Sequence, residues 1–195
     1  MKITIISAST RNNSESRRVS DYLSGRLTKF NIENTILDLN EKRLPLYDDT
    51  GEGSWKELWD DMSHLLEDSN GFVFVSPEWD GMFSVGLHNM FHYTDKELAD
   101  KPVLAVGVSS GRGGRYPLQQ MRTMGYKNKS FVVIPESLYY DHVKEALVGG
   151  ELTDTRATER ADYVLKVLVE YVKALDAVRK SGVIDYKKFF LGFVS

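Results

Sequence analysis

The sequence predicts a three-layer α/β/α sandwich around a five-stranded parallel sheet of order 2-1-3-4-5. Two observations favour this class. Short apolar runs alternate with longer segments in which apolar residues recur at helical spacing. The segments between the runs also provide the helical crossovers that parallel strands require. In sheets of this order, ligands bind outside the carboxyl ends of the strands.

The five strands are expected at the five short apolar runs. The first run lies around Ile5, and the others span residues 34–39, 72–76, 103–108 and 131–135. Short continuous apolar runs are typical of strands that helices cover on both faces. We therefore expect a buried parallel sheet.

Helices are expected between these strands and after the last one. Apolar residues three and four positions apart form three stripes, namely Val19, Tyr22, Leu23, Leu27 and Phe30; Trp55, Leu58, Trp59, Met62, Leu65 and Leu66; and Ala161, Val164, Leu165, Leu168, Val172 and Leu175. Shorter helices are expected at about 84–93 and 115–124. Trp55 and Trp59 lie one turn apart, so we expect them in the core or in a subunit contact rather than against a cofactor.

The composition excludes several classes of function. With 195 residues, of which 42% are hydrophobic, the chain is expected to form one domain around one core. The formal net charge of −3 argues against a nucleic-acid partner, which requires a basic surface. The absence of cysteine excludes disulfides and thiolate nucleophiles, and it fits a cytoplasmic protein. No segment approaches the roughly 20 apolar residues of a membrane span, so no membrane partner is expected.

A hydroxyl-rich loop with one arginine follows the first strand. It contains Ser9, Arg11, Ser14 and Ser16 and leads into the first predicted helix. A helix N-terminus offers unpaired N–H groups and a partial positive charge, so these side chains suit a bound anion. The loop lacks the Gly-Lys-Ser/Thr ending of a Walker loop and the spaced glycines of a dinucleotide fingerprint, so a phosphomonoester fits better. An ordinary helix cap is the alternative.

Two further loops follow the third and fourth strands, and we expect both at the same edge of the sheet as the first. Residues 76–81 combine a proline, two carboxylates and a glycine in a predicted tight turn, and Trp79 and Phe83 add flat apolar surface. Residues 109–115 hold three glycines and two arginines, which permit a close backbone approach to a ligand. The two loops are suited to bracket a planar heterocycle.

The three motifs together resemble those of the NADPH-dependent FMN reductase family, flavodoxin-like flavoproteins that include quinone, chromate and azo-dye reductases. The family's Gly-Ser-x-Arg-x-x-Ser loop corresponds to residues 8–14, and its Thr/Ser-Pro-Glu-Tyr-Asn-Gly motif corresponds to residues 76–81. The next helix carries a glycine, leucine, lysine and asparagine that correspond to residues 86–89, and the glycine-rich loop corresponds to residues 109–114. The resemblance covers roughly residues 1–175.

The resemblance implies a flavodoxin-like fold, an FMN cofactor and NADPH or NADH as co-substrate. Hydride would pass to the flavin, which would then reduce a flavin, a quinone or another small electron acceptor, with no catalytic side chain and no metal. The FMN phosphate would be held by Ser9, Arg11, Ser14 and Ser16. The residues expected to line the ring are Pro77, Glu78, Trp79, Asp80, Gly81, Ser110, Gly111 and Gly113. Arg112 and Arg115 are candidates for the 2′-phosphate of NADPH, although such segments are also common in solvated loops.

Four positions depart from the family pattern. Ala8 replaces a glycine, and Trp79 keeps the aromatic ring of a tyrosine but loses its hydroxyl. His88 replaces a lysine and weakens its positive charge at neutral pH. Asp80 replaces a neutral asparagine. We hypothesise that a carboxylate close to the ring would disfavour the reduced flavin or weaken FMN binding.

Other functions stay open at this point. A non-catalytic electron carrier or flavin-binding regulatory protein would keep the site but react poorly with the nicotinamide. A domain that has lost the flavin would be favoured if Trp79 filled the pocket. His88 and His92 lie four residues apart, as in some zinc sites, but no third ligand is evident nearby, so no metal is expected.

Residues 1–180 are expected to form the FMN-binding domain, and residues 181–195 an apolar tail. Three phenylalanines lie in this tail, and their exposure to water would be unfavourable. We expect the tail to pack on its own domain or on a second subunit, consistent with the homodimers and homotetramers of the family. Tyr139, Tyr140 and His142 are expected to close a loop after the fifth strand, and the alternative is that this position approaches the flavin of a neighbouring subunit.

Overall fold

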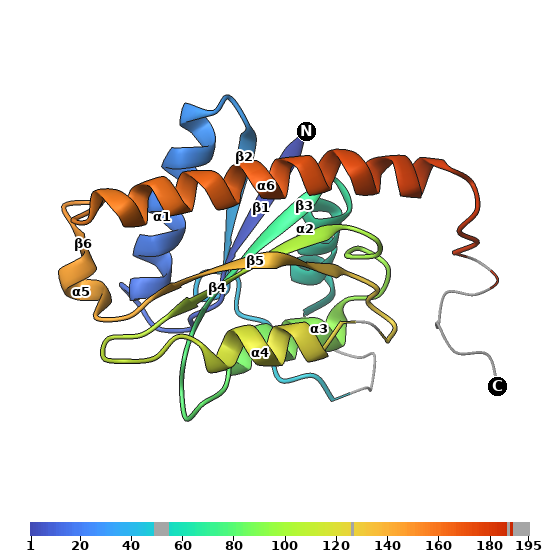
Figure 1. The fold of residues 1–195 in the computed structure, drawn as a ribbon. Coiled ribbons are helices and arrows are strands. Elements are labelled where there is room, and N and C mark those ends of the chain that lie inside the picture. Colours follow the sequence, from blue (N-terminus) through green and yellow to red (C-terminus); the bar gives the residue numbers. More distant parts are fainter. Residues whose placement is uncertain (49–54, 126, 187, 189–195) are drawn as a thin grey trace.

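The computed structural model describes residues 1–48, 55–125, 127–186 and 188, and its main sheet is parallel with the order β2-β1-β3-β4-β5 (Figure 1). The predicted fold class is therefore confirmed. The strands of this sheet are β1 (Lys2–Ser7), β2 (Glu33–Asp38), β3 (Gly71–Pro77), β4 (Pro102–Val108) and β5 (Val132–Tyr140). The helices are α1 (Glu15–Lys29), α2 (Trp55–Glu67), α3 (Val85–Tyr93), α4 (Tyr116–Thr123), α5 (Val143–Ala146) and α6 (Thr155–Lys180). A small antiparallel hairpin of β6 (Leu147–Val148) and β7 (Glu151–Leu152) precedes α6.

Helices cover both faces of the sheet. Val73 and Val75 pack in the core layer with α1 and α6, whereas Phe72 and Phe74 pack in the opposite layer with α2, α3 and α4. The two sets alternate along β3 because successive side chains of a strand point to opposite faces. Figure 1 shows the long helix α6 lying beside α1. Every residue of β3 is buried, as the continuous apolar run predicts.

The predicted strands and helices are confirmed, but the fifth strand is longer than the apolar run that predicted it. The run ends at Pro135, whereas β5 continues to Tyr140. A proline has no N–H for the ladder, and the β4–β5 register shifts between Val103 and Ala105, opposite this segment. The expectation that Tyr139 and Tyr140 close a loop is wrong, because both pair with the end of β4.

Of the two tryptophans of α2, Trp59 lies in the core and Trp55 is half-buried against it. Trp59 is buried, and its ring centroid lies 5.6 Å from that of Tyr93 in α3. The ring of Trp55 lies 5.0 Å from the same tyrosine in an edge-on arrangement. These contacts join α2 to α3.

The predicted tail begins where α6 ends, at Lys180. In its described part, the Tyr186 hydroxyl donates a hydrogen bond to Asp100 Oδ2 at 2.7 Å, so the start of the tail packs on its own domain. The three phenylalanines of the tail lie outside the described residues. Within the described part of the chain, no helix combines the length and hydropathy that a bilayer span requires.

Lys101, just before β4, is a buried charge at the C-terminal end of α2. Its side chain is 8% exposed, and Nζ donates to the carbonyls of Leu66 and Glu67 at 2.8 and 2.7 Å. The last carbonyls of a helix lack intrahelical partners, so Lys101 caps α2. Burial, followed by the charge of Arg179, lowers the pKa of Lys101 to about 8. A neutral amine still has two N–H donors for the two carbonyls.

We predict that Lys101 makes the free energy of unfolding rise with pH between about 8 and the ordinary lysine pKa of 10.5. In this window the unfolded chain holds a proton that the folded chain has released, so higher pH favours the folded state by at most about 1.4 kcal/mol per pH unit. Urea unfolding at about pH 8 and about pH 9.5 measures this slope for the native protein and for Lys101→Met, which lacks the titrating group. Equal slopes in the two proteins would contradict the prediction.

Candidate functional site

The loop between β1 and α1 holds the predicted phosphate ligands. Ser14 caps α1, because its Oγ accepts a hydrogen bond from the N–H of Arg17 at 3.1 Å. Ser9 is fully buried, and its Oγ accepts from the N–H of Arg11 at 3.3 Å. Both hydroxyls therefore fix the shape of the loop, while the Arg11 side chain stays exposed. The cap and the anion-binding interpretations of this loop are compatible.

Two buried hydroxyls flank this loop without a hydrogen-bond partner among the described residues. They belong to Ser7, the last residue of β1, and to Ser16, in the first turn of α1. Unpaired buried polar groups are costly, and the first N–H groups of a helix also lack intrahelical partners. A bound anion supplies acceptors for such groups at the positive end of the helix dipole. The loop therefore fits the phosphate of FMN.

Residues after β2 brace the same loop. Arg43 Nη2 donates to the carbonyl of Thr10 at 2.5 Å and to the side chain of Asn40 at 2.6 Å. Asn40 in turn donates to Asn12 Oδ1 at 2.8 Å. Arg43 thus adds a second positive charge beside the loop that holds Arg11.

The start of α3 holds the loop from another side. Ser84 caps α3 by accepting from the N–H of Leu87 at 3.2 Å, and its hydroxyl donates to the carbonyl of Ala8 at 2.5 Å. A Cβ at Gly86 would lie 2.7 Å from the methyl carbon of Thr10, which is closer than side chains tolerate. Glycine at this position lets the β1 loop lie directly against α3.

A tight hairpin turn follows β3. Trp79 and Met82 exchange two backbone hydrogen bonds of 3.0 and 2.8 Å. Between them, Asp80 and Gly81 have φ angles of +50° and +74°. Two consecutive positive φ angles are the mark of a type I′ turn, which favours asparagine or aspartate followed by glycine. Asp80 therefore preserves the turn of the family motif and carries its carboxylate exposed at the tip.

Arg11 and Trp79 meet across the edge of the sheet. The guanidinium carbon of Arg11 lies 5.1 Å from the centroid of the Trp79 ring, a separation at which a cation and an aromatic face attract each other. The predicted phosphate ligand and the predicted neighbour of the flavin ring therefore belong to one surface. Trp79 also lines a cavity of about 400 Å³ rather than filling it.

The carboxylate of Glu78 ties the β3 loop to the β4 loop. Glu78 Oε2 accepts hydrogen bonds from the N–H groups of Gly114 at 2.6 Å and Tyr116 at 3.4 Å. The N–H of Glu78 donates to the carbonyl of Val108 at 2.9 Å. Because Tyr116 begins α4, the carboxylate also lies at the positive end of that helix. Glu78 is therefore a positioning residue that keeps two loops together.

The β4 loop packs directly on its own strand. A Cβ at Gly107 would lie 1.7 Å from the carbonyl oxygen of Gly114, so no side chain fits there. Gly114 has a φ of +83°, a conformation that side chains disfavour. A Cβ at Gly113 would lie 3.3 Å from both carboxylate oxygens of Glu78, so Gly113 lies under the Glu78 carboxylate.

The far end of the β4 loop is held by β5 and α5. The N–H of His142 donates to the carbonyl of Gly111 at 3.0 Å. The guanidinium of Arg115 lies 4.0 Å from the ring centroid of Tyr139 and 3.6 Å from Asp141 Oδ2. Arg115 is therefore engaged with β5 and the residue that follows it. Ser110, Gly111 and Arg112 are exposed, and they form the open face of this loop.

The cavity of about 400 Å³ opens beside the hairpin. It is lined by Trp79, Asp80, Met82, Phe83, Val85, His88 and Gln120. The side chain of Gln120 in α4 accepts a hydrogen bond from the N–H of Phe83 at 3.0 Å, which fixes one wall. Flat apolar side chains with few polar groups are typical of sites for small aromatic molecules.

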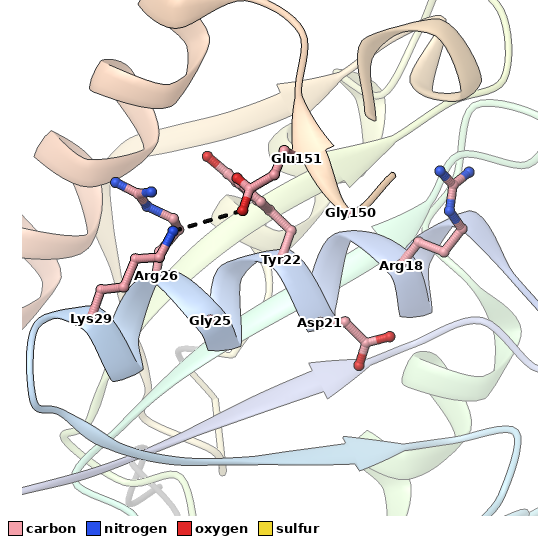
Figure 2. Close-up of a pocket in the computed structure, with 8 residues that line it drawn as sticks. All are labelled: Arg18, Asp21, Tyr22, Gly25, Arg26, Lys29, Gly150 and Glu151. Carbon is pink, nitrogen blue, oxygen red and sulfur yellow. Dashed lines mark ion pairs between the residues drawn. The ribbon is translucent and has the colours of Figure 1, made fainter. Parts of the chain in front are cut away.

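A second cavity, of about 250 Å³, lies between α1 and β7 (Figure 2). Three cations in its wall already pair with carboxylates of the chain: Arg18 with Glu15, Arg26 with Asp162, and Lys29 with Glu151. It shares no lining residue with the three loops. We therefore place the candidate site at the carboxyl edge of the sheet.

Comparison with known proteins shows the family of the chain. The sequence profile of the NADPH-dependent FMN reductases matches residues 1–145, which include all three loops. The chain belongs to the NADPH-dependent FMN reductase family. Its activity is that of an FMN-dependent NAD(P)H oxidoreductase.

Individual members and structures show the same relationship. The FMN-dependent NADPH-azoreductase of Staphylococcus saprophyticus is 29% identical over 127 residues, which are 63% of this chain and 68% of that protein. The flavoenzyme NAD(P)H:(acceptor) oxidoreductase FerB from Paracoccus denitrificans has a TM-score of 0.75 and 17% identity, over 89% of this chain and 97% of its own. The apo form of the NADH:FMN oxidoreductase EmoB has a TM-score of 0.67 and 12% identity, over 89% of both chains. At these identities the two structures show the fold alone.

The sequence did not single out three residues that shape this edge. Ser84 is the first residue of the helix predicted at about 84–93, and the preference of serine for N-caps could have identified it as the cap. Gly107 interrupts an apolar strand, a pattern that often marks a close backbone approach. Arg43 has no comparable signal, because it acts through a contact with a loop 33 residues earlier.

We predict that Gly107→Ala displaces the β4 loop, because the added methyl group would meet the backbone of Gly114. Such overpacking should lower the free energy of unfolding by about 1–3 kcal/mol and weaken FMN binding on the order of tenfold. Thermal unfolding and FMN titration measure the two effects. Gly25→Ala is the matched control, since nothing lies within 4 Å of a Cβ there, and it should leave FMN affinity unchanged. If Gly107→Ala binds FMN as the native protein does, the close approach does not shape the site.

Proposed function

We propose that the carboxyl edge of the sheet binds FMN and uses it to reduce a small aromatic acceptor with electrons from NAD(P)H. The observation that carries this proposal is the meeting of Arg11 and Trp79, which joins the hydroxyl-rich loop to the hairpin. The residues proposed to hold the phosphate are Ser9, Arg11, Ser14 and Ser16. Those proposed to hold the ring are Pro77, Trp79, Asp80, Gly81, Ser110, Gly111 and Gly113, with Glu78 holding their loops together.

FMN and the protein chain have different roles in the proposed reaction. When bound, FMN supplies the redox chemistry by accepting hydride from the nicotinamide and passing two electrons to the acceptor. For a quinone acceptor, NAD(P)H, one proton and the quinone give NAD(P)⁺ and the hydroquinone. The chain contributes binding and orientation. The close contacts at Gly86 and Gly107 and the hydrogen bonds of the Glu78 carboxylate hold the loops in position without a ligand. No side chain is required to move a proton at the site.

The acceptor is proposed to bind in the cavity beside the hairpin. Trp79 and Phe83 give this cavity aromatic walls, and Met82 and Val85 add apolar surface that is 52% and 62% exposed. Exposed apolar surface of this kind favours contact with a flat ligand or another protein surface. Quinones and free flavins have this flat shape, and the azo compounds implied by the name of the related azoreductase share it.

The same exposed residues support a proposal about assembly. We propose a homodimer or homotetramer in the cytoplasm, in which Met82, Val85 and Tyr116 contribute to the subunit contact. Tyr116 is 66% exposed beside the same edge. Such an arrangement would shield the acceptor cavity from water.

Arg112 is proposed to contact the 2′-phosphate of NADPH. Arg115, which contacts Tyr139 and Asp141, is a second candidate for this role.

We predict that Arg11→Gln weakens FMN binding by about tenfold to a hundredfold, because a charge-assisted hydrogen bond to a phosphate contributes about 1.5–3 kcal/mol. Riboflavin has the same ring and no phosphate, so its affinity should not change. Quenching of tryptophan fluorescence or equilibrium dialysis gives both dissociation constants. Arg156→Gln, on α6, is the control for the loss of one positive charge. Equal weakening for FMN and riboflavin would show that Arg11 acts through Trp79, and unchanged FMN affinity would place the phosphate elsewhere.

A further inference from the structure

A third cavity, of about 170 Å³, lies next to the proposed acceptor cavity. It is lined by His88, Phe91, His92, Met124, Gly125, Lys127, Lys129 and Phe131. His88 also lines the cavity beside Trp79, so one side chain forms part of both walls. The ring centroids of Phe83 and His88 are 5.7 Å apart, and those of His88 and His92 are 5.2 Å apart. A row of aromatic rings thus leads from the acceptor cavity into the third cavity.

The described lining of this third cavity carries four basic side chains and no carboxylate. This is unusual in a chain whose formal net charge is −3. The nearest acidic groups to act on Lys129 are Asp95 and Glu97. Glu97 is already engaged, since one of its oxygens accepts from Ser63 and the other from the N–H of Asp95. Asp95 and Glu97 therefore keep their negative charges beside Lys129, whereas the described lining of the cavity itself contains basic groups and no acidic one.

Of the four basic residues, Lys129 is half-buried, and His88, His92 and Lys127 are exposed. Lys129 Nζ donates to the carbonyl of Thr94, and burial lowers the pKa of Lys129. Desolvation, and then the neighbouring His92, lower the pKa of His88. Both effects disfavour the charged forms of Lys129 and His88. An anion bound among these groups would relieve both costs, because it favours the charged form of each.

We propose that this cavity binds the acidic substituent of an aromatic electron acceptor whose ring lies in the cavity beside Trp79. The preferred substrates are aromatic electrophiles that carry a sulfonate or carboxylate group. This inference rests on the proposed function, since it assigns the acceptor to the cavity beside Trp79. The phosphate of NADPH is the competing source of the anion. The exposed Arg112, on the β4 loop and outside both cavities, is the better placed residue for that phosphate.

The test compares two quinones with the same ring system, 1,2-naphthoquinone and its 4-sulfonate. Lys127→Gln should lower kcat/KM for the sulfonate by about tenfold, and it should leave the neutral quinone within about twofold, because only the sulfonate uses the charge. His92→Gln should also lower kcat/KM for the sulfonate more than for the neutral quinone. Lys166 is an exposed lysine on α6, far from the cavity. Lys166→Gln removes the same charge and should leave kcat/KM unchanged for both quinones. The KM for NADPH should stay constant in all variants.

Several outcomes would overturn the inference. Equal losses for both quinones would show a structural role for Lys127, and unchanged kinetics for the sulfonate would show that the cavity does not bind it. A rise in the KM for NADPH alone would assign the cavity to the coenzyme. If the native protein reduces neither quinone, the proposed function fails, and calorimetric titration with naphthalene-2-sulfonate still tests the cavity. Tighter binding of this probe to the native protein than to Lys127→Gln supports the inference, and equal binding contradicts it.

Discussion

The shape of the candidate site depends on two glycines at which a neighbouring segment lies too close for a side chain. Gly107 of β4 lies against the carbonyl of Gly114, and Gly86 of α3 lies against Thr10. A Cβ would overlap the backbone of Gly114 at the first position and the methyl group of Thr10 at the second, so the observed loop positions favour glycine at both. The loop after β1 therefore packs on α3, and the loop after β4 packs on its own strand. The site is therefore formed by the packing of the protein itself, before a ligand binds.

Two polar side chains stabilise this arrangement. Ser84 joins the β1 loop to α3, and Glu78 joins the β3 hairpin to the start of α4. Asp80 lies at the tip of a type I′ turn, where an aspartate supports the positive φ as an asparagine does. Its charge consequently changes the electrostatics of the site without changing its backbone. His88 replaces a lysine, and it lines a cavity together with three other basic residues, His92, Lys127 and Lys129.

Most of the fold and the position of the site could be predicted from the sequence, because both follow from local patterns. Apolar runs and helical stripes predicted the order of strands, and the family motifs placed the three loops at one edge. The sequence could not predict the full length of β5, since Pro135 interrupts its pattern while the pairing with β4 resumes beyond it. The hydrogen bonds of Glu78 to the β4 loop and of Arg43 to Thr10 could not be predicted from the sequence either, because only the fold brings these partners together.

The central claim is that the three loops form one FMN site whose geometry the chain provides in advance. A crystal structure of the protein with FMN tests it most directly. We expect the phosphate at the N-terminus of α1, in contact with Arg11 and Ser14, the ring beside Trp79, and the Glu78 contact with Gly114 unchanged. A phosphate bound in the cavity between α1 and β7, or loops that rearrange to admit the ring, would contradict this account.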